Sequence, residues 1–132
     1  RQGVFVLHHA ILAFPAWGTW SEITGIRQRS HANLANQTVR AEVVNRSHPI
    51  TRGMKDWEMV DETYLMDSPG MECYPLLVTH HPLSMRVLAW TKLFRLARVM
   101  CYQSGHDREA YENLSYRQVL HQGIRWLAGR EI

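Results

Sequence analysis

The sequence predicts an α/β domain with a mixed sheet, and three observations support this prediction. A short apolar strand opens the chain, and a helical pattern follows it directly. Several strand-like runs fill the middle, and an amphipathic helix closes the chain. One long and one short helix cover little of so many strands, whereas a parallel sheet needs helices on both faces. We therefore expect the carboxyl-terminal portion of a larger α/β unit whose first strands are missing.

Length and composition indicate one ordinary globular domain. The 132 residues suit a single domain spanning residues 1–132, incomplete at its amino end, and 45% of them are hydrophobic. The net charge of +3 is too mild, and the basic residues are too scattered, to indicate a nucleic-acid partner. No run approaches the roughly 20 apolar residues that span a bilayer, so no membrane partner is expected.

The chain begins with a predicted strand and a short helix. Gly3–Leu7 is short, apolar and rich in β-branched and aromatic side chains, which is typical of a buried strand. Trp17, Trp20 and Ile23 then recur at helical spacing. Gly25 is a suitable end for that helix, because glycine commonly follows a last helical turn.

The middle of the chain alternates predicted strands with turns. Residues 27–37 are polar and lack a period, so we expect an irregular segment there. His48 precedes a proline, which disfavours helix at that position, and His48–Thr51 is expected to form a turn that enters a short helix. The strands predicted from alternation or apolar runs are Thr38–Val44, Trp57–Leu65, Pro75–Thr79, Arg86–Trp90 and Ala97–Tyr102.

The last predicted helix has the clearest periodicity. Ser115 and Gln118 form a capping box at its start, and Gly129 can end it. Its apolar residues share one face and are Tyr116, Val119, Leu120, Gly123, Ile124 and Leu127.

Histidines at strand ends are the strongest indication of function. In an open α/β sheet, ligands bind just beyond the carboxyl ends of the strands. Imidazole is also the side chain best suited to ligate a metal or move a proton near neutral pH. Three apolar runs of this chain end at such residues, namely His8-His9, His80-His81 and Gly105-His106.

His8 and His9 occupy the position where α/β enzymes place a nucleophile or a phosphate-binding turn. Successive residues of an extended chain point to opposite sides, so at most one of the two is expected to face a pocket. The alternative is a pair of strand-end histidines that bond only to backbone groups.

Gly105-His106-Asp107 is a second candidate. Glycine permits a tight turn after the strand, and that turn would present His106 at the edge of the sheet. Asp107 either orients the imidazole ring or lies in solvent.

Asp61 and Glu62 are adjacent carboxylates within a predicted strand, so we expect one to point inward and one outward. A buried Glu62 beside histidines could act as a general base or a metal ligand. The alternative is a strand stabilised by salt bridges.

The other histidines and the cysteines favour structural interpretations. His80 and His81 precede a proline and are expected in a surface loop, whereas His31 and His121 have no supporting neighbours. The two cysteines do not form a metal-type pair, and Cys101 is expected to pack as a small hydrophobic residue. Free cysteines favour a reducing compartment.

Several segments, in order along nearly the whole chain, match one known family. They are Gly3–His8, Trp20–Gly25, His48–Gly53, Asp61–Tyr64, Ala89-Trp90, Arg98-Val99, Gly105-His106 and Gly123–Leu127. No single segment is specific, and their order and spacing carry the match. By these segments the chain resembles the trehalose-utilisation (ThuA-like) family.

The resemblance implies a flavodoxin-like α/β sandwich of the class I glutamine amidotransferase-like superfamily, with its opening strands upstream of Arg1. The turn after Gly3–His8 replaces the cysteine elbow of the amidotransferases, so glutamine amidotransfer is not expected. The Gly105-His106 turn stands where that superfamily keeps a catalytic histidine. Lys92–Ala97 lacks the glycine usual in the family, so a loop expected near the pocket departs from the family pattern.

The resemblance also implies a role in the use of trehalose or keto-sugars, and we expect a sugar-active hydrolase, lyase or isomerase. The candidate catalytic groups are His8, Glu62 and His106. Candidate ligands for a divalent metal such as zinc are His8, His9, Glu62 and His106. Candidate sugar-binding residues are His9, Trp17 and Tyr64.

The alternative function is a non-catalytic module of the same fold that binds carbohydrate or a protein. The expected partner is a small sugar, and self-association into a homo-oligomer is compatible with the sequence. A cytoplasmic location is favoured, while the missing amino end leaves the periplasm or secretion open.

Overall fold

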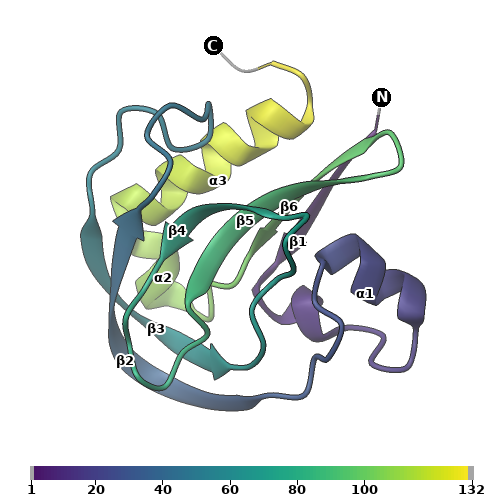
Figure 1. Ribbon diagram of the computed structural model, residues 1–132. Coiled ribbons are helices and arrows are strands. Elements are labelled where there is room, and N and C mark those ends of the chain that lie inside the picture. The colour runs from purple at the N-terminus through teal and green to yellow at the C-terminus, as the bar shows by residue number, and fades with distance from the viewer. Residues whose placement is uncertain (1, 131–132) are drawn as a thin grey trace.

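The computed structural model describes residues 2–130 and confirms the α/β class (Figure 1). Its sheet has six strands in the order β1-β6-β5-β4-β2-β3. The strands are β1 (Gly3–Leu7), β2 (Ala32–Val43), β3 (Trp57–Leu65), β4 (Tyr74–Val78), β5 (Val87–Phe94) and β6 (Ala97–Tyr102). The helices are the 3₁₀ helix η1 (His8–Leu12), α1 (Gly18–Thr24), α2 (Arg108–Glu112) and α3 (Leu114–Leu127).

The pairing of β1 with β6 brings two predicted strand ends together. These two strands are parallel, and Leu7 pairs with Tyr102 at their carboxyl ends. The other pairs in the sheet are antiparallel. Because parallel strands end at the same edge, the residues that follow Leu7 and Tyr102 emerge side by side.

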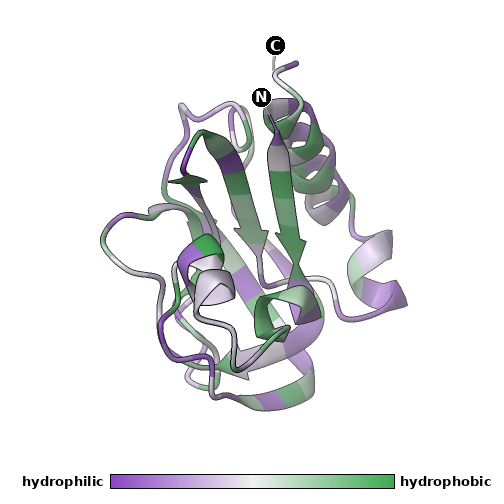
Figure 2. Cartoon of the chain, turned by 90° about the vertical axis from the view of Figure 1, so that its right-hand side faces the viewer, coloured by the Kyte–Doolittle hydropathy of each residue, from purple (hydrophilic) through white to green (hydrophobic). Residues whose placement is uncertain are grey.

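Helices cover both faces of the sheet, as Figures 1 and 2 show. Alternation along β1 sends Phe5 and Leu7 into the core that also holds Val119 of α3. Val4 and Val6 pack instead into a second core with Ile23 of α1. The strands between the helices are therefore predominantly hydrophobic, and these two cores fix the positions of the strand ends.

Strand β2 begins earlier than the sequence pattern predicts. The prediction of an irregular segment over residues 27–37 is wrong from Ala32 onward, because β2 runs from Ala32 to Val43. An irregularity in the pairing with β3 lies between Leu34 and Gln37, where Asn36 has a φ of 57°. This bulge interrupts the alternation of side chains between the two faces of the strand. Most residues before the bulge are exposed, so the first part of β2 lacks the alternation of apolar and polar residues that would have predicted a strand.

Two connections differ from the predictions. Residues 48–53 form turns without the expected short helix, and the His48 carbonyl accepts hydrogen bonds from Thr51 N and Arg52 N. The Lys92–Ala97 segment is the β5–β6 hairpin, at the amino end of β6, so it lies away from the carboxyl ends where the candidate site was expected.

The carboxyl-terminal helix is capped by a different residue from the one predicted. The Asn113 side chain accepts a 2.9 Å hydrogen bond from Tyr116 N, so the capping box at Ser115 is wrong. Asp107 caps the additional short helix α2 by accepting from Glu109 N at 3.1 Å. Gly129, with a φ of 71°, follows the end of α3 as expected.

Among residues 2–130, no helix has both the length and the apolar character needed to cross a bilayer.

We expect Asn113→Ala to destabilise the protein by about 1 kcal/mol, because it leaves the first turn of α3 without its side-chain acceptor. Chemical denaturation measures this change. Ser115→Ala is the matched control, since Ser115 does not provide the observed cap, and it should have a smaller effect. Equal destabilisation by both substitutions would contradict the assignment of the cap.

Both cysteines are free and buried, and Cys101 packs within the core that includes Val6 and Val99, as expected. Burial raises the pKa of Cys73 to about 11. These thiols therefore serve as hydrophobic packing groups at neutral pH.

Candidate functional site

The chain turns sharply at the end of β1, and this turn places both adjacent histidines on one cavity. His8 has a φ of 48° and begins η1, so the extended conformation stops at Leu7. The expectation that at most one of His8 and His9 faces a pocket is therefore wrong, because the alternation of an extended strand no longer applies. His8 is buried, whereas His9 is exposed.

The backbone of Gln103 sets the orientation of the His8 ring. His8 Nδ1 lies 2.5 Å from the Gln103 carbonyl oxygen, which can only accept, so Nδ1 carries a proton. The Nε2 atom of His8 then points into the cavity as the available ring nitrogen. The Gln103 side chain also donates to the Glu62 carbonyl at 2.9 Å, which ties the end of β6 to β3.

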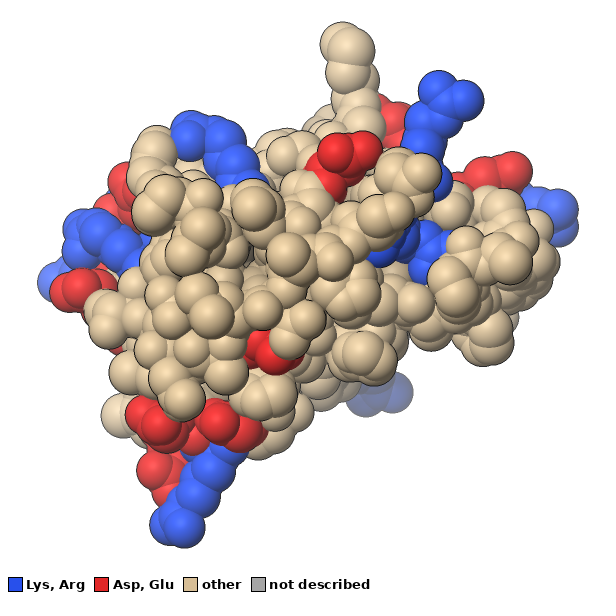
Figure 3. Space-filling model, turned by 90° about the horizontal axis from the view of Figure 1, so that it is seen from below, with Lys and Arg blue, Asp and Glu red and all other residues tan. Residues whose placement is uncertain are grey.

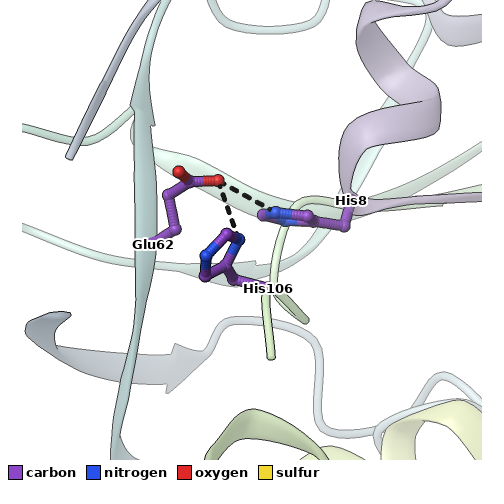
Figure 4. Close-up of side chains that lie close together, drawn as sticks. All are labelled: His8, Glu62 and His106. Carbon is purple, nitrogen blue, oxygen red and sulfur yellow. Dashed lines mark hydrogen bonds and ion pairs between the residues drawn. The ribbon is translucent and has the colours of Figure 1, made fainter. Parts of the chain in front are cut away.

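Glu62 is the point at which the two imidazoles meet. Its Oε1 lies 3.1 Å from His8 Nε2 and 3.2 Å from His106 Nδ1. Dashed lines mark both contacts in Figure 4. Its other oxygen accepts from Asn33 Nδ2 at 3.1 Å. Burial raises the pKa of Glu62, but the hydrogen bond from Asn33 and the charges of the two imidazoles outweigh it and lower the pKa overall. Glu62 is therefore an ionised carboxylate at neutral pH.

These contacts suit a bound cation. If His8 Nε2 carried no proton, its lone pair would face the negative Glu62 oxygen across 3.1 Å. A proton on His8 Nε2, a hydrogen bond donated by the Tyr64 hydroxyl 3.0 Å away, or a metal ion between the two atoms would each relieve this contact. His8, Glu62 and His106 each offer one ligand atom, and these three atoms lie within 4.8 Å of one another. His8 Nδ1 also donates a hydrogen bond to a backbone carbonyl, which is a common outer partner of a metal-ligating histidine.

Asp61 holds the turn that carries His106. Its carboxylate accepts from Gly105 N and from His106 N, each at 3.0 Å. The expectation of one inward and one outward carboxylate is wrong, since Asp61 and Glu62 are both buried. Burial raises the pKa of Asp61, although its backbone hydrogen bonds oppose that effect. Asp107 caps α2, so the hydrogen bonds that position the His106 turn come from Asp61.

Gly105 is required by the geometry of this turn. Its φ is 117°, a conformation that side-chain-bearing residues rarely adopt. A Cβ at this position would lie 2.1 Å from the Tyr116 hydroxyl. The turn can therefore approach α3 only because residue 105 has no side chain.

Tyr64 supplies a hydroxyl to the same cavity. Its OH lies 3.0 Å from His8 Nε2 and 3.4 Å from His9 Nδ1, and its ring stacks on that of His8 at 4.8 Å. Burial and the neighbouring carboxylates raise the pKa of Tyr64, so the phenol stays protonated at neutral pH.

The resulting cavity has a volume of about 340 Å³. Its lining residues come from η1, the residue before β2, β2, β3 and the turn after β6, and are His8, His9, His31, Asn33, Glu62, Tyr64 and His106. It thus brings together all the candidate site residues except Trp17, which lies outside this lining and stacks on Trp20 with ring centroids 6.3 Å apart.

Sequence reasoning missed three residues of the site. His31 and Asn33 belong to the segment without a detectable period, and the bulge in β2 explains why that segment shows no strand alternation. Gln103 acts on His8 through a backbone carbonyl, which has no side-chain signature, although its place directly after β6 could have indicated it. His80 and His81 lie in the loop after β4, where His80 contacts Glu42 at 2.8 Å, and His121 is exposed on α3.

Comparison with known proteins identifies the family. The ThuA family, described as trehalose utilisation, matches residues 2–127. No curated protein sequence matches the chain.

Solved structures show the same fold. A ThuA-like protein from Parabacteroides merdae is 19% identical with a TM-score of 0.77, and the match covers 98% of this chain and 61% of that one. A ThuA-like protein from Bacteroides uniformis is 17% identical with a TM-score of 0.76, covering 98% and 59%. A cytoplasmic protein of Salmonella typhimurium is 11% identical with a TM-score of 0.69, covering 95% and 55%.

These likenesses confirm the predicted flavodoxin-like α/β fold. The chain spans about three fifths of the length of the ThuA-like structures, from the 61% and 59% of each that it covers. The family match extends over nearly the whole chain, in agreement with the resemblance drawn from its segments. The chain therefore belongs to the ThuA (trehalose utilisation) family.

Proposed function

We propose that this chain carries the reacting site of a sugar-active enzyme, a hydrolase, lyase or isomerase, in which a divalent metal such as zinc is held by His8, Glu62 and His106. The observation that carries the proposal is the convergence of two imidazole nitrogens on one oxygen of a buried carboxylate, at 3.1 and 3.2 Å. The family description, trehalose utilisation, supplies the substrate class.

The donor set fits such a metal. Two imidazoles and one carboxylate suit zinc and the other divalent first-row metals, and a catalytic site keeps a position open for substrate or water. The adjoining cavity provides that open side. A metal bound here would act as a Lewis acid toward an oxygen of the sugar.

The surrounding residues orient these groups and handle protons. Gln103 fixes the ring of His8 through its carbonyl, and Asn33 fixes the second oxygen of Glu62. Tyr64, kept protonated, can donate a hydrogen bond to a sugar oxygen in the cavity. His9, exposed on the same cavity and 3.4 Å from the Tyr64 hydroxyl, is placed to exchange a proton with solvent.

Metal binding by the full-length protein tests this proposal. We expect one zinc ion per chain after reconstitution, measured by mass spectrometry and by calorimetric titration, and turnover of a sugar that chelation removes and zinc restores. His106→Ala should weaken zinc binding more than about 100-fold, beyond what loss of an outer partner costs, and abolish turnover. His121→Ala is the matched control, since His121 is exposed on α3. Equal zinc affinity and turnover in the two variants would overturn the proposal.

A further inference from the structure

The Tyr64 hydroxyl lies against the same ring nitrogen of His8 that faces Glu62. Its oxygen is 3.0 Å from His8 Nε2, and the Glu62 oxygen is 3.1 Å from that atom. Because Nδ1 of His8 donates to the Gln103 carbonyl, Nε2 of the neutral ring is an acceptor. A carboxylate can only accept, so the hydroxyl is the neighbour that brings a proton to Nε2. His9 Nδ1 is farther from the hydroxyl, at 3.4 Å, and is the weaker competitor for that proton.

The other groups around the cavity leave this role to Tyr64. The Asn33 side chain donates to one oxygen of Glu62 at 3.1 Å, and His106 Nδ1 lies 3.2 Å from the other oxygen. No Lys or Arg of residues 2–130 lines the cavity. The face on which β1 and β6 end, viewed in Figure 3, has scattered charges of both signs. No cationic side chain in this part of the protein therefore replaces the phenol as a donor.

Packing holds the phenol in this position. Tyr64 is 2% exposed, and its ring stacks on that of His8 with centroids 4.8 Å apart. The oxygen cannot swing into solvent while this packing is kept. The hydroxyl hydrogen can still rotate about the C–O bond, so Tyr64 can change its hydrogen-bond partner without changing its place.

A metal ion at His8 and the hydroxyl hydrogen of Tyr64 need the same lone pair. The unprotonated nitrogen of an imidazole has one lone pair, and a zinc ion lies about 2.0–2.1 Å from such a nitrogen. The hydrogen of a hydrogen bond lies at about the same distance from its acceptor, roughly 2 Å. An ion can therefore bind Nε2 only after the hydroxyl hydrogen has turned away.

We propose that Tyr64 sets the metal affinity of this site, by donating to His8 Nε2 a hydrogen bond that the metal ion must replace. This inference rests on the proposed function and adds the control of metal loading to it. Before an ion binds, the bond satisfies a lone pair that would otherwise face the Glu62 carboxylate. Its loss weakens the net gain from metal binding, and the released hydrogen can turn to an oxygen of a ligand in the cavity.

Zinc titration of the full-length protein and of its Tyr64→Phe variant tests the inference. The substitution removes the hydroxyl and keeps the ring that stacks on His8. We expect the variant to bind zinc about three- to tenfold more tightly, which is the factor for one hydrogen bond that no longer has to be broken. Calorimetry at about pH 8, above the ordinary imidazole pKa of about 6.5, limits competition from protons. Tyr74→Phe is the matched control, since Tyr74 is exposed on β4 and should not affect zinc binding.

Nitrogen-15 NMR of the zinc-free, full-length protein gives a second readout at the same pH. We expect His8 Nε2 to resonate as an unprotonated nitrogen that accepts a hydrogen bond. Its resonance should move toward that of a free imidazole nitrogen in Tyr64→Phe and stay unchanged in Tyr74→Phe. A side chain that only supported the fold would not produce this combination of a tighter metal site and a changed nitrogen resonance.

The outcomes separate this inference from the proposed function. Zinc affinity of Tyr64→Phe that is no higher than that of the unchanged protein, or a gain matched by Tyr74→Phe, overturns the control by Tyr64 and leaves the zinc site standing. A protonated His8 Nε2 in the zinc-free protein also overturns it, because the hydroxyl could not donate to that atom. Absence of zinc binding by the unchanged protein overturns the proposed function and this inference together.

Discussion

Glu62→Gln should lower sugar turnover by about 10²- to 10⁴-fold, the range expected when a group that handles charge or protons in the reaction is neutralised. The substitution keeps the size of the side chain but removes the negative charge that both imidazoles approach. It also replaces one carboxylate oxygen with an NH₂ group, which donates hydrogen bonds and does not accept them. The side chain can then no longer accept from Asn33 with one oxygen and face both histidines with the other. Zinc affinity should fall with turnover.

Glu58→Gln is the matched control for this experiment, because Glu58 lies on the same strand but is exposed. Both variants should remain folded by circular dichroism. Steady-state kinetics and zinc titration would then report on the site alone. Turnover of the Glu62 variant within a few fold of the Glu58 variant would contradict the role assigned to this carboxylate.

Gly105→Ala should have the largest effect on stability, because it combines two costs. A φ of 117° is strained for alanine, at about 1–3 kcal/mol. The new Cβ would lie 2.1 Å from the Tyr116 hydroxyl, and overpacking of this kind adds about 1–3 kcal/mol. Relief of the clash would also displace His106, so we expect turnover to be lost together with stability.

Two further variants separate these costs by chemical denaturation. Gly53→Ala introduces a side chain at a φ of 78° with no atom within 4 Å, so it should show the backbone cost alone. The double variant Gly105→Ala/Tyr116→Phe removes the nearest clashing atom and should recover part of the lost stability. No difference between the Gly105 and Gly53 variants would contradict the proposed contact with Tyr116.

The sequence predicts part of the site because simple geometry connects it. His8 and His106 follow two strands that run in parallel, so their proximity follows from the strand-end rule. The contribution of Glu62 depends on how β3 passes the ends of β1 and β6, and this long-range arrangement leaves no local pattern. The buried Asp61 was also beyond prediction, since alternation alone suggests that one of two adjacent carboxylates faces solvent.

Local rules failed where the backbone departs from regular geometry. At His8 a positive φ ends the strand, and both neighbouring histidines reach the same cavity. At residues 34–37 a bulge conceals the start of β2, and with it Asn33 and His31. Asn113 competes with Ser115 as a cap, and the sequence pattern alone favoured the wrong one. These departures lie mostly around the cavity, where function tolerates irregular structure.

The two neighbouring carboxylates of β3 have a consequence for the dynamics of the domain. Asp61 secures the backbone of the His106 turn, while Glu62 meets the side chains of that histidine and of His8. A transient detachment of β3 would thus release the anchor of the loop and the shared partner of the rings in one event. Local opening of this single strand would therefore loosen the His106 turn and separate both imidazoles from their shared carboxylate together, while the Gln103 carbonyl would still hold the ring of His8.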